Sequence, residues 1–201
     1  MKKFLFCIGL LCLLVACSSP GKISDDEQIK CLESFKNKLK SINAVYLAPW
    51  DFVQTRHSLV EKEVVDYQYA IKHKKEKLEI RYSITPYVKP VKETNKVIIG
   101  SENLYKAFTL TVLMNIVSGK QENIFSGEIL DKTKAKSDFN ADWVAIYVMK
   151  PESDFAKNYK YVHLLTFYKK NAGQVYIYYL FDDFKLAENQ LMPMLKSVSF
   201  Y

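Results

Sequence analysis

The sequence predicts an α+β domain in which helices cover both faces of a mainly antiparallel sheet, a three-layer α/β/α sandwich. Two early runs, 65–71 and 78–85, alternate apolar and polar residues, as strands of a half-buried hairpin do. Three later runs, 143–149, 161–168 and 175–181, are apolar on both faces, which is typical of strands in the middle of a covered sheet. Segments with helical periodicity lie before, between and after these strands, so helices are available for both faces.

The first predicted helix spans 25–41. Ser24 and Glu27 have the spacing of a capping box, and the acids that follow Ser24 suit the positive end of a helix dipole. The apolar residues then recur every three or four positions, which predicts one buried stripe. This stripe consists of Ile29, Leu32, Phe35, Leu39 and Ile42.

The stretch 45–57 predicts an irregular strand interrupted at Pro49, since proline cannot donate to a strand ladder. The hairpin of 65–71 and 78–85 follows it. Its connection, Lys72–Lys77, carries four lysines, and we interpret this charge run as an exposed loop.

The second predicted helix begins near Ser101 and stops near Gly119. Apolar residues cover most of its circumference, so we expect it to be deeply buried. Thr109–Val112 is equally compatible with a strand. The next stretch, 120–140, is polar and has little periodicity, so we expect a long loop that could contact a partner.

The chain ends in a hairpin, a helix and a short extended piece. The loop 169–173 is short enough to make its flanking strands antiparallel neighbours. Asp182 and Asp183 suit the start of a final helix, and Pro193 should end or kink it. Val198 and Phe200 belong to the last extended segment.

The N-terminus predicts an exported protein. Lys2 and Lys3 precede the apolar run 4–15, which is too short to span a membrane and is typical of a secretory signal peptide. The following Leu14-Val15-Ala16-Cys17 resembles the lipobox of bacterial lipoproteins. The resemblance implies removal of residues 1–16 and attachment of lipid to Cys17. The alternatives are an ordinary signal peptide with a chance cysteine and an uncleaved membrane anchor.

The predicted domain organisation is a signal peptide at 1–16, a lipidated tether at 17–23 and one globular domain at 24–201. The order of elements resembles the PsbP-like sandwich fold. The residues that carry this resemblance are at the end of the chain, where a hairpin leads into Tyr178–Asp183, then a helix, then Leu195–Phe200. The resemblance implies an accessory or binding protein, since members of that fold are mostly non-enzymatic.

Chemical motifs are sparse. The six glycines form no phosphate-binding loop, and no Gly-x-Ser-x-Gly elbow is present. The three histidines, His57, His73 and His163, are far apart in sequence and lack metal-ligand spacing. Cys31 is the one cysteine left after Cys17, and we expect it to be a small apolar packing residue.

Two further patterns are weak. Asp138, Asn140 and Asp142 alternate like the first ligands of a calcium loop, but Trp143 replaces the required glycine, so we favour a structural loop. Trp50 and Trp143 could line a pocket, and we favour the core for both. We therefore expect no catalytic, cofactor-binding or metal-binding residue and no cofactor. The one predicted site residue is Cys17, which carries lipid.

Three functions are compatible with these features. The preferred hypothesis is a membrane-anchored bacterial lipoprotein of the cell envelope, with a non-enzymatic domain on the extracytoplasmic side that binds a partner protein or supports an assembly. The second is a binding protein for a small amphipathic or lipid ligand, which requires a pocket of several hundred cubic ångströms. The third is a hydrolase with a dispersed site. The formal net charge of +7 is modest, and an exported protein rarely meets nucleic acid, so no nucleic-acid partner is expected.

Overall fold

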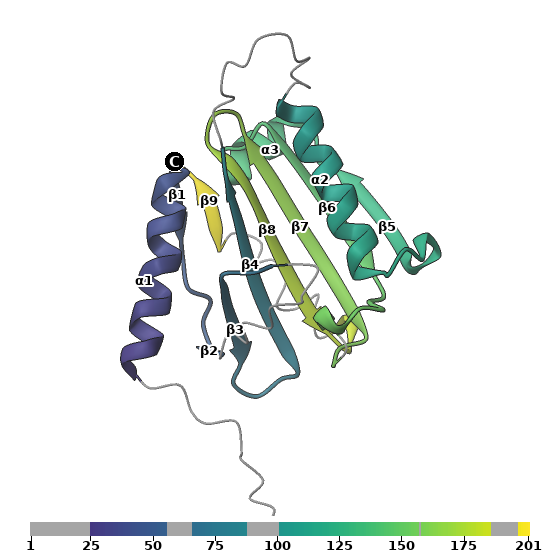
Figure 1. Ribbon diagram of the computed structural model, residues 1–201, viewed down its shortest axis with the longest axis horizontal. Helices are drawn as coiled ribbons and strands as arrows, with labels where there is room; N and C mark the ends of the chain where they lie inside the picture. Colours follow the sequence, from purple (N-terminus) through teal and green to yellow (C-terminus); the bar gives the residue numbers. More distant parts are fainter. Residues whose placement is uncertain (1–24, 56–65, 88–100, 157, 186–196) are drawn as a thin grey trace, which may run out of the picture.

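The computed structural model describes residues 25–55, 66–87, 101–156, 158–185 and 197–201 (Figure 1). The predicted signal peptide, Cys17, Ser24, His57 and most of the last predicted helix lie outside the described residues. The helices are α1 (Asp25–Ser41), α2 (Ser101–Ile116) and α3 (Lys132–Phe139), with 3-10 turns at Gln121–Asn123 and Asp154–Ala156. The strands are β1 (Ala44–Tyr46), β2 (Phe52–Gln54), β3 (Tyr69–His73), β4 (Leu78–Pro86), β5 (Ile124–Ile129), β6 (Trp143–Met149), β7 (Tyr161–Lys169), β8 (Gly173–Phe181) and β9 (Val198–Phe200).

Seven strands form one sheet in the order β2-β3-β4-β8-β7-β6-β5, and β1 pairs with β9 separately. All of these neighbouring pairs are antiparallel. β8 lies in the middle and pairs along its whole length with both β4 and β7, so Tyr179 lies opposite Ile80 on one side and His163 on the other. The predicted α+β class with a mainly antiparallel sheet is confirmed.

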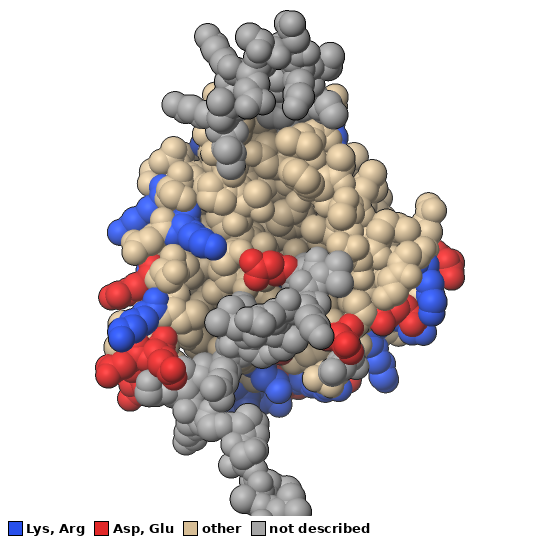
Figure 2. All heavy atoms as spheres, in the orientation of Figure 1, with Lys and Arg blue, Asp and Glu red and all other residues tan. Residues whose placement is uncertain are grey.

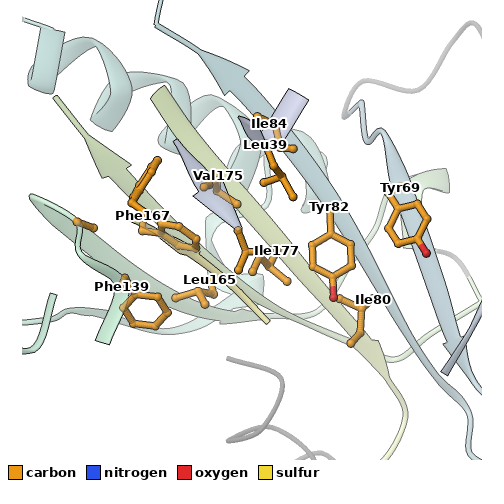
Figure 3. Packing of buried hydrophobic residues seen from close by; sticks show 14 of the residues in the cluster. Leu39, Tyr69, Ile80, Tyr82, Ile84, Phe139, Leu165, Phe167, Val175 and Ile177 are labelled. Atoms are coloured by element: carbon orange, nitrogen blue, oxygen red, sulfur yellow. The ribbon is translucent and has the colours of Figure 1, made fainter. Parts of the chain in front are cut away.

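One face of the sheet packs against α1, α3 and the β1–β9 pair. Phe35 of α1 is buried and stacks on Tyr69 of β3 with ring centroids 4.6 Å apart. Phe139 of α3 contacts Phe167 of β7, and Figure 3 shows both rings beside the apolar side chains of β8. These residues share one buried cluster, because alternate positions of each strand point to the same face.

The other face packs against α2. Leu113 and Ile116 of α2 belong to a second buried cluster with Leu164 of β7 and Tyr178 of β8. Figure 1 shows α2 lying over β7 and β6 on this side. The loop after β6 adds Phe155 and Tyr159 to the same cluster and so extends the cover below α2.

The first helix and most strands agree with the sequence. The strand predicted at 65–71 is an exception: it is β3 at Tyr69–His73, because Lys72 and His73 of the predicted loop pair with β2. α1 has the predicted bounds, and Phe35, Leu39 and Ile42 of its stripe are buried, although Ile29 is exposed. The predicted strand interrupted near Pro49 corresponds to two separate short strands, β1 and β2, and the predicted last extended piece is β9. Within the described ranges, no helix is both long and apolar enough to cross a membrane.

The predicted loop over 120–140 is wrong, because the structure has a strand and a helix there. β5 is the edge strand of the sheet and exposes most of its residues, so its sequence carries little apolar alternation. α3 is only eight residues long. Asp131 caps it by accepting a hydrogen bond from the Lys134 N–H, and Ala135 and Phe139, four residues apart, are its buried side chains.

Two burial predictions are also wrong. α2 is buried along one stripe only, and Leu104, Phe108 and Leu110 on its remaining surface are exposed. Apolar residues around a helix require neighbours on all sides, and the described residues supply them on the sheet side alone. Trp143 is buried as expected, but Trp50 is 93% exposed, because it lies in the turn between β1 and β2.

Candidate functional site

A groove lies between α2 and the end of the sheet formed by β4 and β8. We call it the α2 groove. Its volume is about 500 Å³, which is within the usual range for binding pockets. Its lining residues come from α1, the segment before β3, β4, α2 and β8: Lys38, Asp66, Gln68, Ser83, Ile84, Thr85, Pro86, Phe108, Thr111, Val112, Asn115, Tyr176 and Tyr178.

The exposed side of α2 forms one wall of the groove. Positions 104, 108, 111 and 115 are three or four residues apart, so they share one side of the helix. Phe108 is 46% exposed and Leu104 is 39% exposed, so two large apolar side chains one helical turn apart lie on this surface. Figure 2 shows that the face over α2 and the adjoining sheet has few charged side chains, while Lys, Arg, Asp and Glu gather at its margins. A face with few charges and with exposed large apolar side chains is typical of a binding surface.

Three buried polar side chains fix α2 on the sheet beside the groove. The Gln174 Nε2 donates to Thr166 Oγ1 and Thr109 Oγ1, both at 2.9 Å. Thr109 Oγ1 itself donates to the Tyr105 carbonyl at 3.0 Å. All three polar side chains are at most 1% exposed. These hydrogen bonds join α2 to β7 and β8, and they set the height of α2 above the groove floor.

The gap in strand pairing at the end of β4 opens the groove toward the sheet edge. β3 pairs with β4 from Glu79 to Tyr82 only. Beyond that point the Gln68 side chain replaces a strand, because its Oε1 accepts a hydrogen bond from the Ile84 N–H at 2.6 Å. This arrangement leaves room for the groove where a longer β3 would otherwise run.

The polar groups of the groove suit recognition. Burial raises the pKa of Tyr176 to about 12 and holds that of Tyr178 well above its ordinary value, with Tyr176 and Asp66 adding to the effect on Tyr178. Both phenols therefore stay neutral at physiological pH and can donate or accept hydrogen bonds. Lys38 and Asp66 supply one charge of each sign at the groove surface.

A cluster around Arg81 fixes the sheet face below the groove. Its guanidinium lies between the rings of Tyr67 and Phe155, at 4.7 and 4.8 Å from their centroids. It also donates to the Phe155 carbonyl, and its Nε donates to Glu79 Oε1 at 2.6 Å. The Tyr159 hydroxyl donates to the other Glu79 oxygen at 2.9 Å. Each charged group is thus paired within an aromatic surrounding, as buried charges require.

The residues considered from the sequence do not converge on the groove. Cys17 and His57 lie outside the described residues. Cys31 is half-buried on α1, donates weakly to the Gln68 carbonyl at 3.9 Å, and has its thiol pKa raised by burial, so it lacks the electropositive setting of a reactive thiol.

The two described histidines also lie elsewhere. The His73 Nδ1 accepts hydrogen bonds from the N–H groups of Lys75 and Glu76 and shapes the β3–β4 turn. His163 packs beside Tyr179 on the face away from α2, and burial lowers its pKa to about 4. At neutral pH this imidazole is uncharged.

The residues of the calcium-like pattern have structural partners. Asn140 is the left-handed C-cap of α3, and Asp142 accepts a hydrogen bond from the Lys170 N–H at 2.7 Å. Asp138 accepts from the Ser137 hydroxyl at 2.9 Å. In the part of the chain that the structure describes, no group of three His, Cys, Asp or Glu side chains could hold a metal ion.

Sequence reasoning missed the α2 groove, although two signals for it were present. The helix 101–116 has more apolar residues than one buried stripe needs, so some had to be exposed or to meet another partner. Gln174, Thr166 and Thr109 are polar residues within apolar stretches, which indicates paired side chains in a core.

No family model matches the chain, and no curated protein sequence matches it. Among solved structures, the chain is similar to the solution structure of cyanobacterial PsbP (CyanoP) from Synechocystis sp. PCC 6803. The similarity covers 80% of this chain and 88% of that chain, with 13% sequence identity and a TM-score of 0.37. At this TM-score the similarity carries no argument.

Proposed function

We propose that this protein is a lipid-anchored component of a bacterial cell envelope whose non-enzymatic domain binds a partner protein through α2. In this proposal residues 1–16 are removed, Cys17 carries the lipid, and the domain lies on the extracytoplasmic side. We further assign the domain to a three-layer α/β/α sandwich of the PsbP-like kind. The observation that carries the binding role is the groove of about 500 Å³ beside α2, together with the exposed apolar side chains Leu104 and Phe108 on a face with few charges.

The α2 surface suits a protein partner for a physical reason. Exposed leucine and phenylalanine side chains lose contact with water when a partner covers them, at about 25 cal/mol for each Å² of apolar area. Leu104 and Phe108 supply such area next to a concave groove, so an apolar side chain of the partner can insert beside Phe108. The Thr111 hydroxyl at the groove wall donates to the Ala107 carbonyl, and its oxygen can accept a hydrogen bond that would orient the inserted segment.

The groove volume supports a second candidate, a small amphipathic or lipid ligand. About 500 Å³ accommodates a drug-sized molecule, and the lining combines aromatic rings with a few polar groups, as small-molecule sites do. Such a ligand would place its apolar part against Phe108 and Val112 and its polar part near Asp66 or Lys38.

The anchor is tested by the intact mass of the full chain isolated from membranes, compared with that of Cys17→Ala. The proposal predicts that the wild type lacks residues 1–16, gains a lipid mass and fractionates with membranes, whereas Cys17→Ala does none of these. Equal behaviour of the two chains without any lipid mass would remove the anchor.

The binding role is tested by capture from membranes with Phe108→Ser and Ile129→Ser variants of the lipidated chain. Ile129 is a matched control, because it is 61% exposed on β5 at the opposite edge of the sheet. The proposal predicts a stoichiometric partner with the wild type and with Ile129→Ser, and its loss with Phe108→Ser. A small molecule that co-purifies in place of a protein favours the second candidate, and equal recovery by all three chains would refute a role for α2.

A further inference from the structure

The turn between β1 and β2 exposes apolar side chains that no described element covers. Trp50 is 93% exposed and Leu47 is 68% exposed. Val53 of β2, close in sequence to Trp50, is 49% exposed. An exposed tryptophan among aliphatic residues is typical of a membrane interface, where the indole ring lies at the level of the headgroups.

A cluster of lysines lies next to this turn. Phe52 of β2 pairs with His73 of β3, so the β1–β2 turn lies beside the β3–β4 hairpin. The Lys74 N–H donates to the Asp51 carbonyl at 2.9 Å, and its ammonium lies 3.7 Å from the Asp51 carboxylate. The hairpin exposes Lys72, Lys74, Lys75 and Lys77; Lys77 is paired with Asp182 at 2.7 Å and Lys74 with Asp51, so Lys72 and Lys75 are its lysines without a carboxylate partner among the described residues. These lysines suit an anionic lipid surface, where each contributes about 1 kcal/mol.

Both features lie at the end of the domain from which the tether leaves. Figure 1 shows the start of α1, β2 and the β3–β4 hairpin at the same end. Asp25 lies eight positions after Cys17 in sequence, and eight Cα-to-Cα steps span at most about 30 Å. A lipid on Cys17 would therefore keep this end within reach of the bilayer. The acids at the start of α1, Asp25, Asp26 and Glu27, are exposed there too, so the lysines and the apolar turn must outweigh them.

We infer that the β1–β2 turn and the β3–β4 hairpin form a second membrane contact, in which Trp50 and Leu47 enter the headgroup region and the hairpin lysines bind anionic lipid. This contact rests on the proposed lipid anchor, and it orients the domain on the membrane. α2 packs on the face of the sheet away from α1, although Lys38 of α1 lines the groove, so a domain held by this end keeps α2 accessible to a partner.

The experiment uses the full lipidated chain in vesicles of phosphatidylcholine, with or without phosphatidylglycerol. The chain has two tryptophans, and Trp143 is only 7% exposed, so the fluorescence change on membrane contact reports Trp50. Trp50→Phe supplies the Trp143 baseline. We expect brominated lipids to quench Trp50 in anionic vesicles, and we expect the vesicles to protect it from acrylamide in water.

Two pairs of lysine variants separate a specific contact from general charge. The double variant Lys72→Gln, Lys75→Gln should weaken the quenching of Trp50. The equilibrium constant for contact of the turn with anionic lipid should fall about fivefold for each lysine lost. Lys132→Gln with Lys134→Gln removes two exposed charges from α3 and should leave the quenching unchanged. High salt should act like the hairpin variants.

Several results would overturn the inference. One is the finding that, in anionic vesicles, acrylamide still quenches the fluorescence of Trp50 while brominated lipid does not. Equal quenching with and without phosphatidylglycerol would remove the role of the lysines. Protection of Trp50 in native membranes but not in pure lipid would assign the turn to a protein partner. Failure of the anchor is seen separately, as a missing lipid mass. In that case the turn is still tested by sedimentation of the unlipidated chain with anionic vesicles, in which the wild type is compared with Trp50→Phe and Trp50→Ser.

Discussion

Gln174 is the side chain whose loss should loosen α2 most directly. In Gln174→Leu the volume is nearly kept, while Thr109 Oγ1 and Thr166 Oγ1 each lose the hydrogen bond that they accept at 2.9 Å. A buried hydrogen bond contributes about 1 kcal/mol net, so the two together contribute about 2 kcal/mol. The Gln174 Oε1 is buried without a partner among the described residues, and its removal offsets part of that loss. We therefore expect destabilisation of about 1–2 kcal/mol.

Urea denaturation of the Gln174→Leu chain measures this change, with Thr111→Val as the control. The Thr111 hydroxyl is exposed and donates only to the Ala107 carbonyl in its own helix, so its loss should change stability by less than about 0.5 kcal/mol. Since Gln174 joins α2 to the sheet, the variant should also weaken capture of the partner. A Gln174→Leu chain as stable as the wild type would refute the view that these hydrogen bonds hold α2 in place.

Three other substitutions test the packing of the sheet. Arg81→Ala should cost about 3–5 kcal/mol in chemical denaturation, because it leaves the Glu79 carboxylate buried without its cation, and Glu79→Gln in the same chain should restore part of the loss. As the pH falls from 6.5 to 4, the free energy of unfolding of the wild type should drop by up to about 3 kcal/mol, because His163 takes up a proton in the unfolded chain but not in the folded chain, where its pKa is about 4. His163→Gln should flatten this part of the pH profile of stability. Gly173→Ala should destabilise by more than about 2 kcal/mol, because the new Cβ would lie 2.5 Å from the Thr85 carbonyl oxygen at φ +151°, while Gly119→Ala, with open space around it, should cost about 1 kcal/mol in the same thermal scan.

The regular parts of the fold could be predicted because their residues carry one clear period. The stripe of α1 contains Phe35, Leu39 and Ile42, which are all buried, and β6 has the bounds expected from its unbroken apolar run. In both elements local propensity and tertiary packing favour the same structure, so a pattern read from the sequence is sufficient.

The edge of the sheet could not be predicted for the opposite reason. β5 pairs on one side only and exposes Phe125 and Ile129, so its apolar residues do not mark a buried face. α3 has two buried side chains in eight residues, which is too few for a period to be recognised. Its N-cap, Asp131, was the available signal, and it lies in a polar stretch that resembles a loop.

The candidate site was hidden because it depends on contacts between distant segments. Gln68 comes close to Ile84 only after the hairpin forms, and Thr109 meets Gln174 across 65 positions of sequence. The exposure of Phe108 and Trp50 likewise depends on what the rest of the chain covers. Composition indicated that aromatic residues were plentiful, and only the topology determined which of them remained on the surface.

The most direct test of the account is photo-crosslinking from position 108 of the full chain, within the host membranes to which the proposal assigns it. The matched position is 133, which is exposed on α3 and lies on the side of the sheet away from α2. The account predicts one discrete adduct from position 108, of protein or ligand mass, that competes with unlabelled wild-type chain, and none from position 133. The absence of an adduct from position 108, or the same adducts from both positions, would contradict the claim that α2 and its groove are the binding surface.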